Sequence, residues 1–142
     1  GQVNSSMSEN QLGYRFIELP RVDDPRGSLT YIEEESTVPF PIRRVYYLYN
    51  FTGKTRGEHA HKELEQVMVV PNGELSVTLD DGKHEETVQL NDPAEGLYIP
   101  PGLWRELTDA TGETFCLVLA SQQYDEGDYI RDYEEFVRWD DE

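Results

Sequence analysis

The segment Leu75–Leu90, LSVTLDDGKHEETVQL, gives the clearest local indication of the fold. In its first half, Leu and Val alternate with Ser, Thr and Asp, as they do on a β-strand that buries one face. Asp81-Gly82 then has the residue preference of a tight hairpin turn, and the strand pattern resumes from Glu86 to Leu90. The segment therefore predicts an antiparallel β-hairpin.

The rest of the chain repeats this pattern of short strands separated by Gly, Pro, Asn and Asp. Further strands are predicted at residues 12–19, 28–34, 42–50, 67–70, 96–99, 104–107 and 113–121. Only the end of the chain has helical spacing, with Asp128 as the predicted N-cap and apolar side chains from Tyr129 to Val137. Together these elements predict an all-β, antiparallel double-sheet jelly roll with a short C-terminal helix.

Length and composition limit the classes of protein to consider. With 142 residues the chain is expected to form a single domain over residues 7–142, and Gly1–Ser6 is interpreted as a tag remnant before Met7. The single cysteine, Cys116, cannot form a disulfide within the chain, and no apolar segment approaches the length of a membrane span. We therefore expect a cytoplasmic protein. A formal net charge of −17 argues against nucleic acid or an anionic membrane as partner.

Two of the three histidines lie close together in the segment Arg56–His61, which Glu65 follows. On an extended strand, His59 and His61 point to the same face because they are two residues apart. Two imidazoles that face one pocket can bind a metal or transfer protons, and the pair alone does not decide between these chemistries.

The spacing His-x-His-x3-Glu resembles the first metal motif of the cupin superfamily. In metal cupins a later Pro-x-Gly-x2-His motif supplies a third histidine, but the matching segment here, Pro100–Arg105, ends in arginine. Because a guanidinium has no lone pair to donate, we expect the cupin shape without a metal and without another cofactor. The histidines would then act as bases beside the carbonyl of an anionic substrate, with Arg105 or a tyrosine hydroxyl stabilising the enediolate. A purely structural hydrogen-bonded histidine pair is the alternative.

Several further segments resemble the nucleotide-sugar 3,4-ketoisomerases, a metal-independent cupin group related in fold to the dTDP-4-dehydrorhamnose 3,5-epimerases. The similarity runs from about Asp24 to Phe136. It is carried by residues 41–47, 56–62, 64–67, 96–101, 104–106, 119–121 and 124–131.

This resemblance implies a substrate, a mechanism and a set of site residues. Members of the family convert dTDP-4-dehydro-6-deoxyglucose to its 3-dehydro isomer, a step towards dTDP-3-amino-3,6-dideoxy sugars. By similarity, His59 and His61 carry the protons through an enediol, one at carbon and one between the oxygens, in an order left open. The implied substrate-binding residues are Arg26, Arg44, Tyr46, Arg56, Gln66, Trp104 and Arg105.

The resemblance also leaves questions open. Part of the family has histidine at the position of Arg105, so the configuration of the product at C4 is undecided. Related enzymes are homodimers whose N-terminal strands are exchanged or packed across the interface, and the strand Val45–Tyr49 would suit such contacts. The alternatives in function are a 3,5- or 5-epimerase of a dTDP-4-keto sugar and a non-catalytic cupin that binds a sugar nucleotide.

Overall fold

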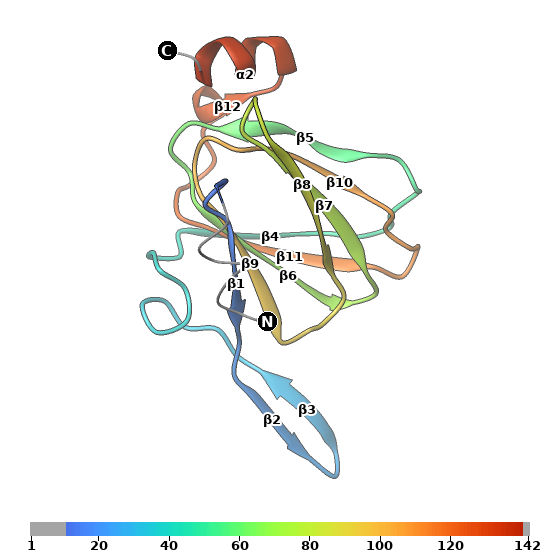
Figure 1. The fold of residues 1–142 in the computed structure, drawn as a ribbon. Helices are drawn as coiled ribbons and strands as arrows, with labels where there is room; N and C mark the ends of the chain where they lie inside the picture. Colours follow the sequence, from blue (N-terminus) through green and yellow to red (C-terminus); the bar gives the residue numbers. More distant parts are fainter. Residues whose placement is uncertain (1–10, 141–142) are drawn as a thin grey trace.

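Two five-stranded antiparallel sheets pack face to face in the computed structural model, which describes residues 11–140 (Figure 1). One sheet has the order β1 (Arg15–Glu18), β9 (Glu95–Ile99), β6 (Gln66–Asn72), β11 (Phe115–Ala120) and β4 (Arg44–Leu48). The other has the order β12 (Tyr129–Ile130), β5 (Arg56–His61), β10 (Trp104–Thr108), β7 (Leu75–Asp80) and β8 (Glu85–Leu90). The predicted all-β jelly roll is confirmed, and the predicted remnant, residues 1–6, lies outside the described residues.

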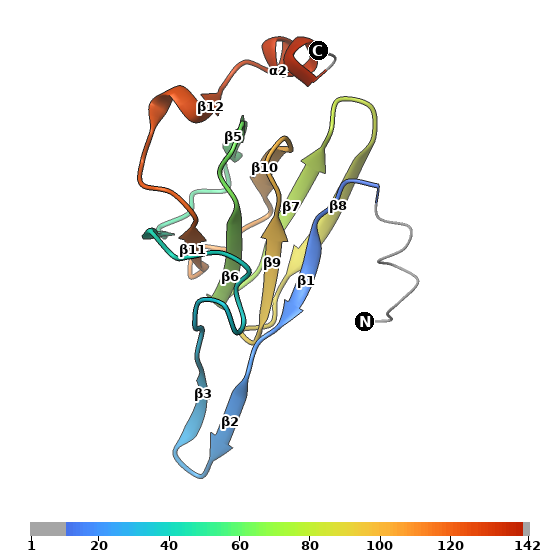
Figure 2. The same cartoon turned by 90° about the vertical axis from the view of Figure 1, so that its left-hand side faces the viewer.

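Four elements lie outside the two five-stranded sheets. Strands β2 (Arg21–Asp24) and β3 (Gly27–Thr30) pair only with each other, and their hairpin projects from the sandwich. The 3-10 helix η1 (Glu126–Asp128) precedes β12, and helix α2 (Tyr133–Asp140) closes the described chain. Figure 2 shows the β2–β3 hairpin and α2 at opposite ends of the molecule. Neither helix within residues 11–140 is long and apolar enough to cross a membrane.

Alternation along the strands divides the space between the sheets into an apolar part and a polar part. Val77 and Leu79 of β7 point inward and are fully buried with Leu97 of β9, Cys116 and Val118 of β11. Nearer β4, β5 and β10, the same inward rows carry polar side chains instead. A ligand can therefore enter beside the apolar core, where Leu48, Met68 and Leu107 border these polar side chains.

The C-terminal helix begins four residues later than the spacing predicts. Tyr129 and Ile130 pair with His61 and Ala60 as strand β12, and Asp128 is buried in η1. Helix α2 starts at Tyr133, and the Asp132 carboxylate accepts a hydrogen bond from the amide of Glu135 at 2.9 Å. The prediction of Asp128 as N-cap was therefore wrong, because its carboxylate is used by other groups.

The predicted hairpin turn at Asp81-Gly82 also differs in detail. The β7–β8 hairpin has a four-residue connection, in which the Asp81 amide donates to the His84 carbonyl at 3.1 Å. The Asp81 carboxylate accepts hydrogen bonds from the amides of Lys83 and His84, which explains why the turn extends beyond Asp81-Gly82.

Candidate active site

A cavity of about 370 Å³ opens at the polar end of the space between the sheets. Ligand sites of enzymes are typically of this size. Its walls come from β4, β5, β6 and β10 and from the segment after η1, so residues distant in sequence meet there. The lining residues are Arg44, Tyr46, Leu48, Arg56, Gly57, Glu58, His59, Gln66, Met68, Arg105, Leu107, Tyr129 and Arg131.

His59 reaches the cavity through an irregularity in strand β5. Arg105 pairs with His59 and Leu107 pairs with Arg56, so β5 has one residue more than β10 between these two pairs. Gly57 lies inside this β-bulge with φ +77°, a conformation that favours glycine. The bulge directs His59 into the cavity opposite Arg105.

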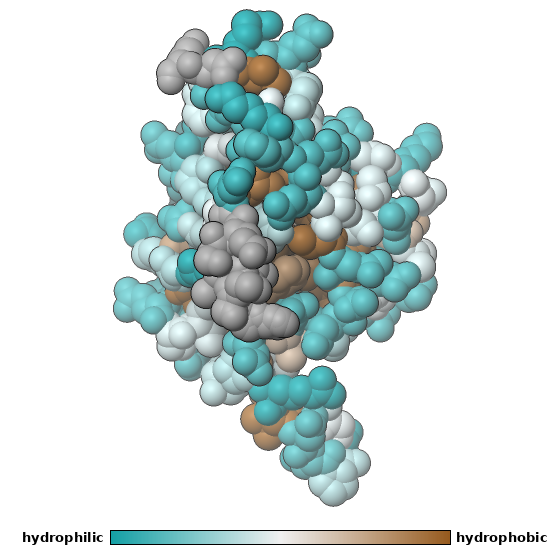
Figure 3. Space-filling view, viewed as in Figure 1, coloured by the Kyte–Doolittle hydropathy of each residue, from teal (hydrophilic) through white to brown (hydrophobic). Residues whose placement is uncertain are grey.

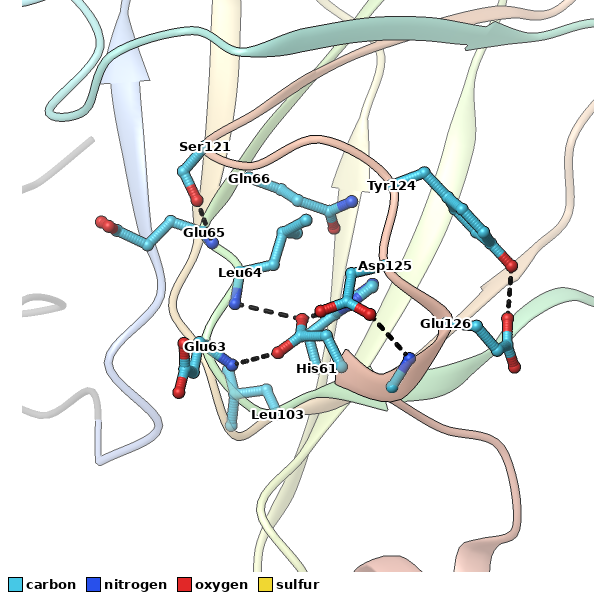
Figure 4. Close-up of polar contacts among 12 residues, drawn as sticks. His61, Glu63, Leu64, Glu65, Gln66, Leu103, Ser121, Tyr124, Asp125 and Glu126 are labelled. Carbon is cyan, nitrogen blue, oxygen red and sulfur yellow. Dashed lines mark hydrogen bonds and ion pairs between the residues drawn. The ribbon is translucent and has the colours of Figure 1, made fainter.

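His61 lies beneath the cavity wall and is held by a carboxylate. Its side chain is fully buried, and its Nδ1 lies 3.1 Å from Oδ2 of Asp128. Asp128 also accepts hydrogen bonds from the amides of Glu63 at 2.8 Å and Leu64 at 3.3 Å, on the loop after β5 shown in Figure 4. Because the carboxylate accepts, Nδ1 carries the proton and Nε2 keeps its lone pair. That Nε2 atom is buried and has no hydrogen-bond partner among the described residues.

Burial makes both histidines neutral. Desolvation first, and then the positive charge of Arg105, lower the pKa of His59 to about 2 and that of His61 to about 3. The imidazole rings lie 4.9 Å apart, and Tyr129 packs against both, at 5.0 Å from His59 and 4.3 Å from His61. At neutral pH the site therefore presents two unprotonated imidazoles, which can act as bases.

Arg105 is a buried cation without a carboxylate partner in the described part of the chain. Its side chain is fully enclosed, and its hydrogen bonds run to the Leu103 carbonyl and to Gln66 Oε1. No ion pair with Arg105 forms within residues 11–140. Burial lowers its pKa to about 10, so the guanidinium remains charged at neutral pH. A buried charge that the protein does not neutralise favours an anionic ligand or an anion formed during reaction.

Three more arginines line the cavity. Nε and Nη2 of Arg44 are buried without a hydrogen-bond partner in the described part of the chain, and its guanidinium lies over Tyr46 at 5.2 Å. Arg56 is exposed at the start of β5. Arg131 lies 4.1 Å over the ring of Tyr129 and pairs with Glu126 at 2.8 Å. The lining thus holds four arginines and a single carboxylate, in a chain with a net charge of −17.

The donor groups of this site do not match a metal centre. Glu65, the third residue of the histidine motif, accepts a hydrogen bond from Tyr98 at 2.7 Å, while its amide bonds to Ser121 (Figure 4). Nδ1 of His61 is taken by Asp128, and Arg105 faces His59. Within residues 11–140, no group of three or more His, Cys, Asp or Glu side chains comes together to hold a metal ion.

Comparisons with known proteins identify the family of the chain. The family model "FdtA: WxcM-like, C-terminal" matches residues 12–140. A curated relative, the TDP-4-oxo-6-deoxy-alpha-D-glucose-3,4-oxoisomerase of Aneurinibacillus thermoaerophilus, is 46% identical over 126 residues, which are 88% of this chain and 91% of that protein. The chain belongs to the FdtA/WxcM-like family. It is an enzyme of the sugar-nucleotide 3,4-ketoisomerase type, as the sequence predicted.

Two solved ketoisomerases share the fold of this family member. A 3,4-ketoisomerase from Helicobacter canadensis matches with a TM-score of 0.91 and 40% identity, over 93% of this chain and all of that one. The sugar 3,4-ketoisomerase QdtA from Thermoanaerobacterium thermosaccharolyticum, solved in complex with TDP, matches with a TM-score of 0.90 and 41% identity, over 92% of this chain and 96% of that one. The cupin-type jelly roll predicted for the ketoisomerase is thereby confirmed.

Most residues assigned to the ketoisomerase site by sequence meet at the cavity, and two do not. The cavity brings together Arg44, Tyr46, Arg56, His59, Gln66 and Arg105, with His61 directly behind. Trp104 faces the other side of β10, where it packs against Phe136 of α2 at 5.8 Å. Arg26 lies at the tip of the β2–β3 hairpin, pairs with Asp24 at 2.7 Å and does not border the cavity of its own chain.

Three residues in or behind the cavity wall were not singled out as site residues from the sequence. Tyr129 and Arg131 line the cavity, and Asp128 holds His61. All three lie in the segment 124–131, which carries part of the family resemblance. Its helical spacing concealed their role, because the spacing predicted a helix where the chain forms η1 and β12.

Proposed function

We propose that the protein moves the ketone of dTDP-4-dehydro-6-deoxyglucose from C4 to C3 of the sugar. The observation that carries this proposal is a neutral histidine, His59, in the wall of a cavity that also holds guanidinium groups without carboxylate partners. Such a site suits a substrate that is anionic and loses a proton from carbon. The curated relative is named for this class of substrate, and QdtA holds TDP.

We assign the carbon step to His59. His59 lines the cavity, whereas His61 lies behind it. His59 takes the proton from C3, the C3–H electron pair forms the C3=C4 double bond, and the carbonyl electrons move to O4. The enediolate then collapses with the ketone at C3, and C4 receives the proton. No electron leaves the sugar, so the step needs no redox cofactor.

We assign the transfer of a proton between O3 and O4 to His61. Asp128 fixes the Nδ1–H tautomer, so Nε2 is available as an acceptor. The buried charge of Arg105 lowers the energy of the enediolate and takes the place that a metal would have in a metal cupin. We therefore propose a metal-independent mechanism.

The remaining arginines are suited to the diphosphate. A guanidinium can bind two phosphate oxygens at once, and Arg44, Arg56 and Arg131 line the cavity. The 3-keto product has the carbonyl that a transaminase requires, which agrees with a role in making dTDP-3-amino-3,6-dideoxy sugars.

The test is turnover of dTDP-4-dehydro-6-deoxyglucose in deuterated water, followed by NMR. A C3 ketone with deuterium at C4 is the expected product. Deuterium at C3 and C5 with the ketone still at C4 would indicate an epimerase, and no exchange would indicate a binding protein. The rate should be unchanged after dialysis against a chelator, and loss of activity that added metal restores would contradict metal independence.

Histidine variants test the assignment of the bases. His59→Asn and His61→Asn should abolish turnover while the Kd of TDP stays within about threefold of wild type, because neither is assigned to the diphosphate. His84→Asn is the matched control, since His84 lies on the β7–β8 turn with 58% of its side chain exposed. Near wild-type rates for both cavity variants would contradict the mechanism.

A further inference from the structure

Three side chains from three strands form a continuous hydrogen-bonded chain along the cavity wall. Nη1 of Arg105 on β10 donates to Oε1 of Gln66 on β6 at 2.5 Å. Nε2 of Gln66 donates to the hydroxyl oxygen of Tyr46 on β4 at 2.8 Å. Arg105 and Gln66 are almost fully buried, at 2% and 1% exposure, so water does not replace these contacts.

The chemistry of the groups fixes the direction of each hydrogen bond. A guanidinium has only donors, so the Gln66 atom that faces Arg105 must be the amide oxygen. The Gln66 atom that faces Tyr46 is then the amide nitrogen, which can only donate. The Tyr46 oxygen is therefore an acceptor in this contact, and its own proton is left for another partner.

No described residue accepts the proton of the Tyr46 hydroxyl, so this proton is available to a ligand in the cavity. Within residues 11–140 the Tyr46 hydroxyl makes one hydrogen bond, which it accepts from Gln66. Tyr46 also lines the cavity. Burial raises the pKa of Tyr46, so the hydroxyl stays protonated at neutral pH and is able to donate. The positive charge of Arg105 at the other end of the chain polarises both hydrogen bonds towards Tyr46.

We propose that the Tyr46 hydroxyl donates a hydrogen bond to the enediolate oxygen, and that Gln66 and Arg105 hold the hydroxyl in this direction. The inference rests on the proposed ketoisomerase function and deepens it. As His59 removes the C3 proton, the C3–H electron pair becomes the C3=C4 bond and the carbonyl pair moves to O4. Tyr46 donates to this oxygen without losing its proton, so no net transfer to tyrosine is needed. Tyr46 is thus a catalytic residue, and Gln66 is a positioning residue.

The first test is the kcat of Tyr46→Phe. Loss of one preoriented donor to an oxyanion lowers kcat by about 10² to 10³-fold, and we expect a loss of this size. The Kd of TDP should stay within about threefold of wild type, because the hydroxyl acts on the sugar ring. Tyr133→Phe is the control, since the Tyr133 hydroxyl bonds Asp80 at 2.7 Å away from the cavity. A Tyr46→Phe enzyme that keeps more than about a third of the wild-type kcat would overturn the proposal.

Gln66→Glu tests the direction of the hydrogen bond. The new carboxylate can still accept from Arg105, but it accepts from Tyr46 as well, so the hydroxyl turns away from the cavity. We expect a loss of kcat similar to that of Tyr46→Phe and less than about threefold further loss in the double variant. If the loss of kcat in the double variant equalled the product of the two single losses, the positioning role of Gln66 would be overturned.

Failure of this inference can be distinguished from failure of the proposed function. Absence of wild-type turnover would contradict the proposed function, whereas wild-type turnover with an active Tyr46→Phe enzyme would contradict only the role of Tyr46. The donor role of Gln66 can also be measured without substrate, from the NMR signals of its side-chain amide. These signals should shift in Tyr46→Phe and not in Tyr133→Phe. Unchanged amide signals in Tyr46→Phe would overturn the hydrogen bond from Gln66 to Tyr46.

Discussion

At the scale of single residues, Arg105 and the two histidines determine each other's charge. They are buried together, so protonation of His59 or His61 would place a second cation beside a guanidinium that has no counter-ion among the described residues. The histidines therefore stay unprotonated, while Arg105 keeps its charge because its ordinary pKa is so much higher. A metal cupin would use the same positions to bind a cation. Here the cation belongs to the protein.

The lowered pKa values predict how the enzyme responds to acid. Because the pKa values of both histidines lie below that of free imidazole, near 6.5, the acid limb of kcat/KM should lie well below pH 6.5. The histidines of the unfolded chain bind protons near pH 6.5, while those of the folded chain do not. The free energy of unfolding is therefore highest above pH 6.5 and decreases as the pH is lowered further. Each histidine changes the free energy of unfolding by at most about 1.4 kcal/mol per pH unit, and this is the slope of stability against pH.

Urea unfolding between about pH 5 and pH 7 measures this slope. His61→Asn should reduce it, because the substituted side chain does not titrate. Equal slopes in wild type and His61→Asn would show that His61 is not the group responsible.

The site residues that the sequence could reveal are those with a regular spacing. His59 and His61 are two apart on one strand, and Arg105 replaces a histidine in a recognisable motif. Asp128 gives no such signal, because its contact with His61 spans 67 residues and depends on how the last loop crosses β5. Pairing of this kind is set by tertiary structure, which local spacing does not encode.

At the scale of elements, one glycine sets the geometry of strand β5. Gly57 has φ +77° in the bulge opposite β10, and an added Cβ would lie 3.2 Å from Cγ of Leu107. Ala at this position faces both the backbone strain and the crowding of Leu107. Since His59 follows two residues later, relief of either strain would move the imidazole.

We therefore expect Gly57→Ala to lose more stability than the backbone strain alone explains. A left-handed conformation costs a non-glycine residue about 1–2 kcal/mol. Gly53→Ala is the matched control, because Gly53 has φ +88° but no atom within 4 Å of an added Cβ. Urea unfolding should show the larger loss for Gly57→Ala, and only this variant should lose kcat. Equal losses of stability and full activity in both would contradict the role of the bulge.

Elements with strict alternation were predictable from sequence, and elements set by pairing were not. The hairpin β7–β8 follows the alternation of Leu75–Leu90 closely. Tyr129 and Ile130 fit a helical spacing equally well, and only the free edge of β5 makes them a strand. Strand β2 has all four residues exposed, so hydrophobic periodicity gives it no signal.

At the scale of the whole molecule, the projecting β2–β3 hairpin carries apolar side chains that its own chain does not bury. Val22 and Leu29 face each other across the hairpin and are 53% and 57% exposed. Figure 3 shows apolar surface on this projection. The edge strand β4 likewise exposes Val45 and Tyr47, each at 53%. Exposed apolar groups on an arm and on an edge strand fit a homodimer, which we propose for this enzyme.

A homodimer would give Arg26 the substrate-binding role that the family resemblance implies. Arg26 lies at the tip of the hairpin, away from the cavity of its own chain, and 89% of its side chain is exposed. In a twofold dimer the hairpin of one subunit can reach the cavity of the other. We predict that Arg26 binds substrate in the partner subunit. We also expect light scattering to show a dimer, and Leu29→Glu to weaken that dimer.

Mixing two inactive variants tests this directly. In a mixed dimer of Arg26→Ala and His59→Asn, one cavity would have its own His59 together with the Arg26 of the second subunit. Random exchange of subunits makes half of the dimers mixed, each with one complete site, so about a quarter of wild-type activity should return. Arg44→Ala mixed with His59→Asn is the control, because Arg44 and His59 line the cavity of the same chain and no complete site can form. Full activity of Arg26→Ala alone, or no recovery on mixing, would contradict binding across the interface.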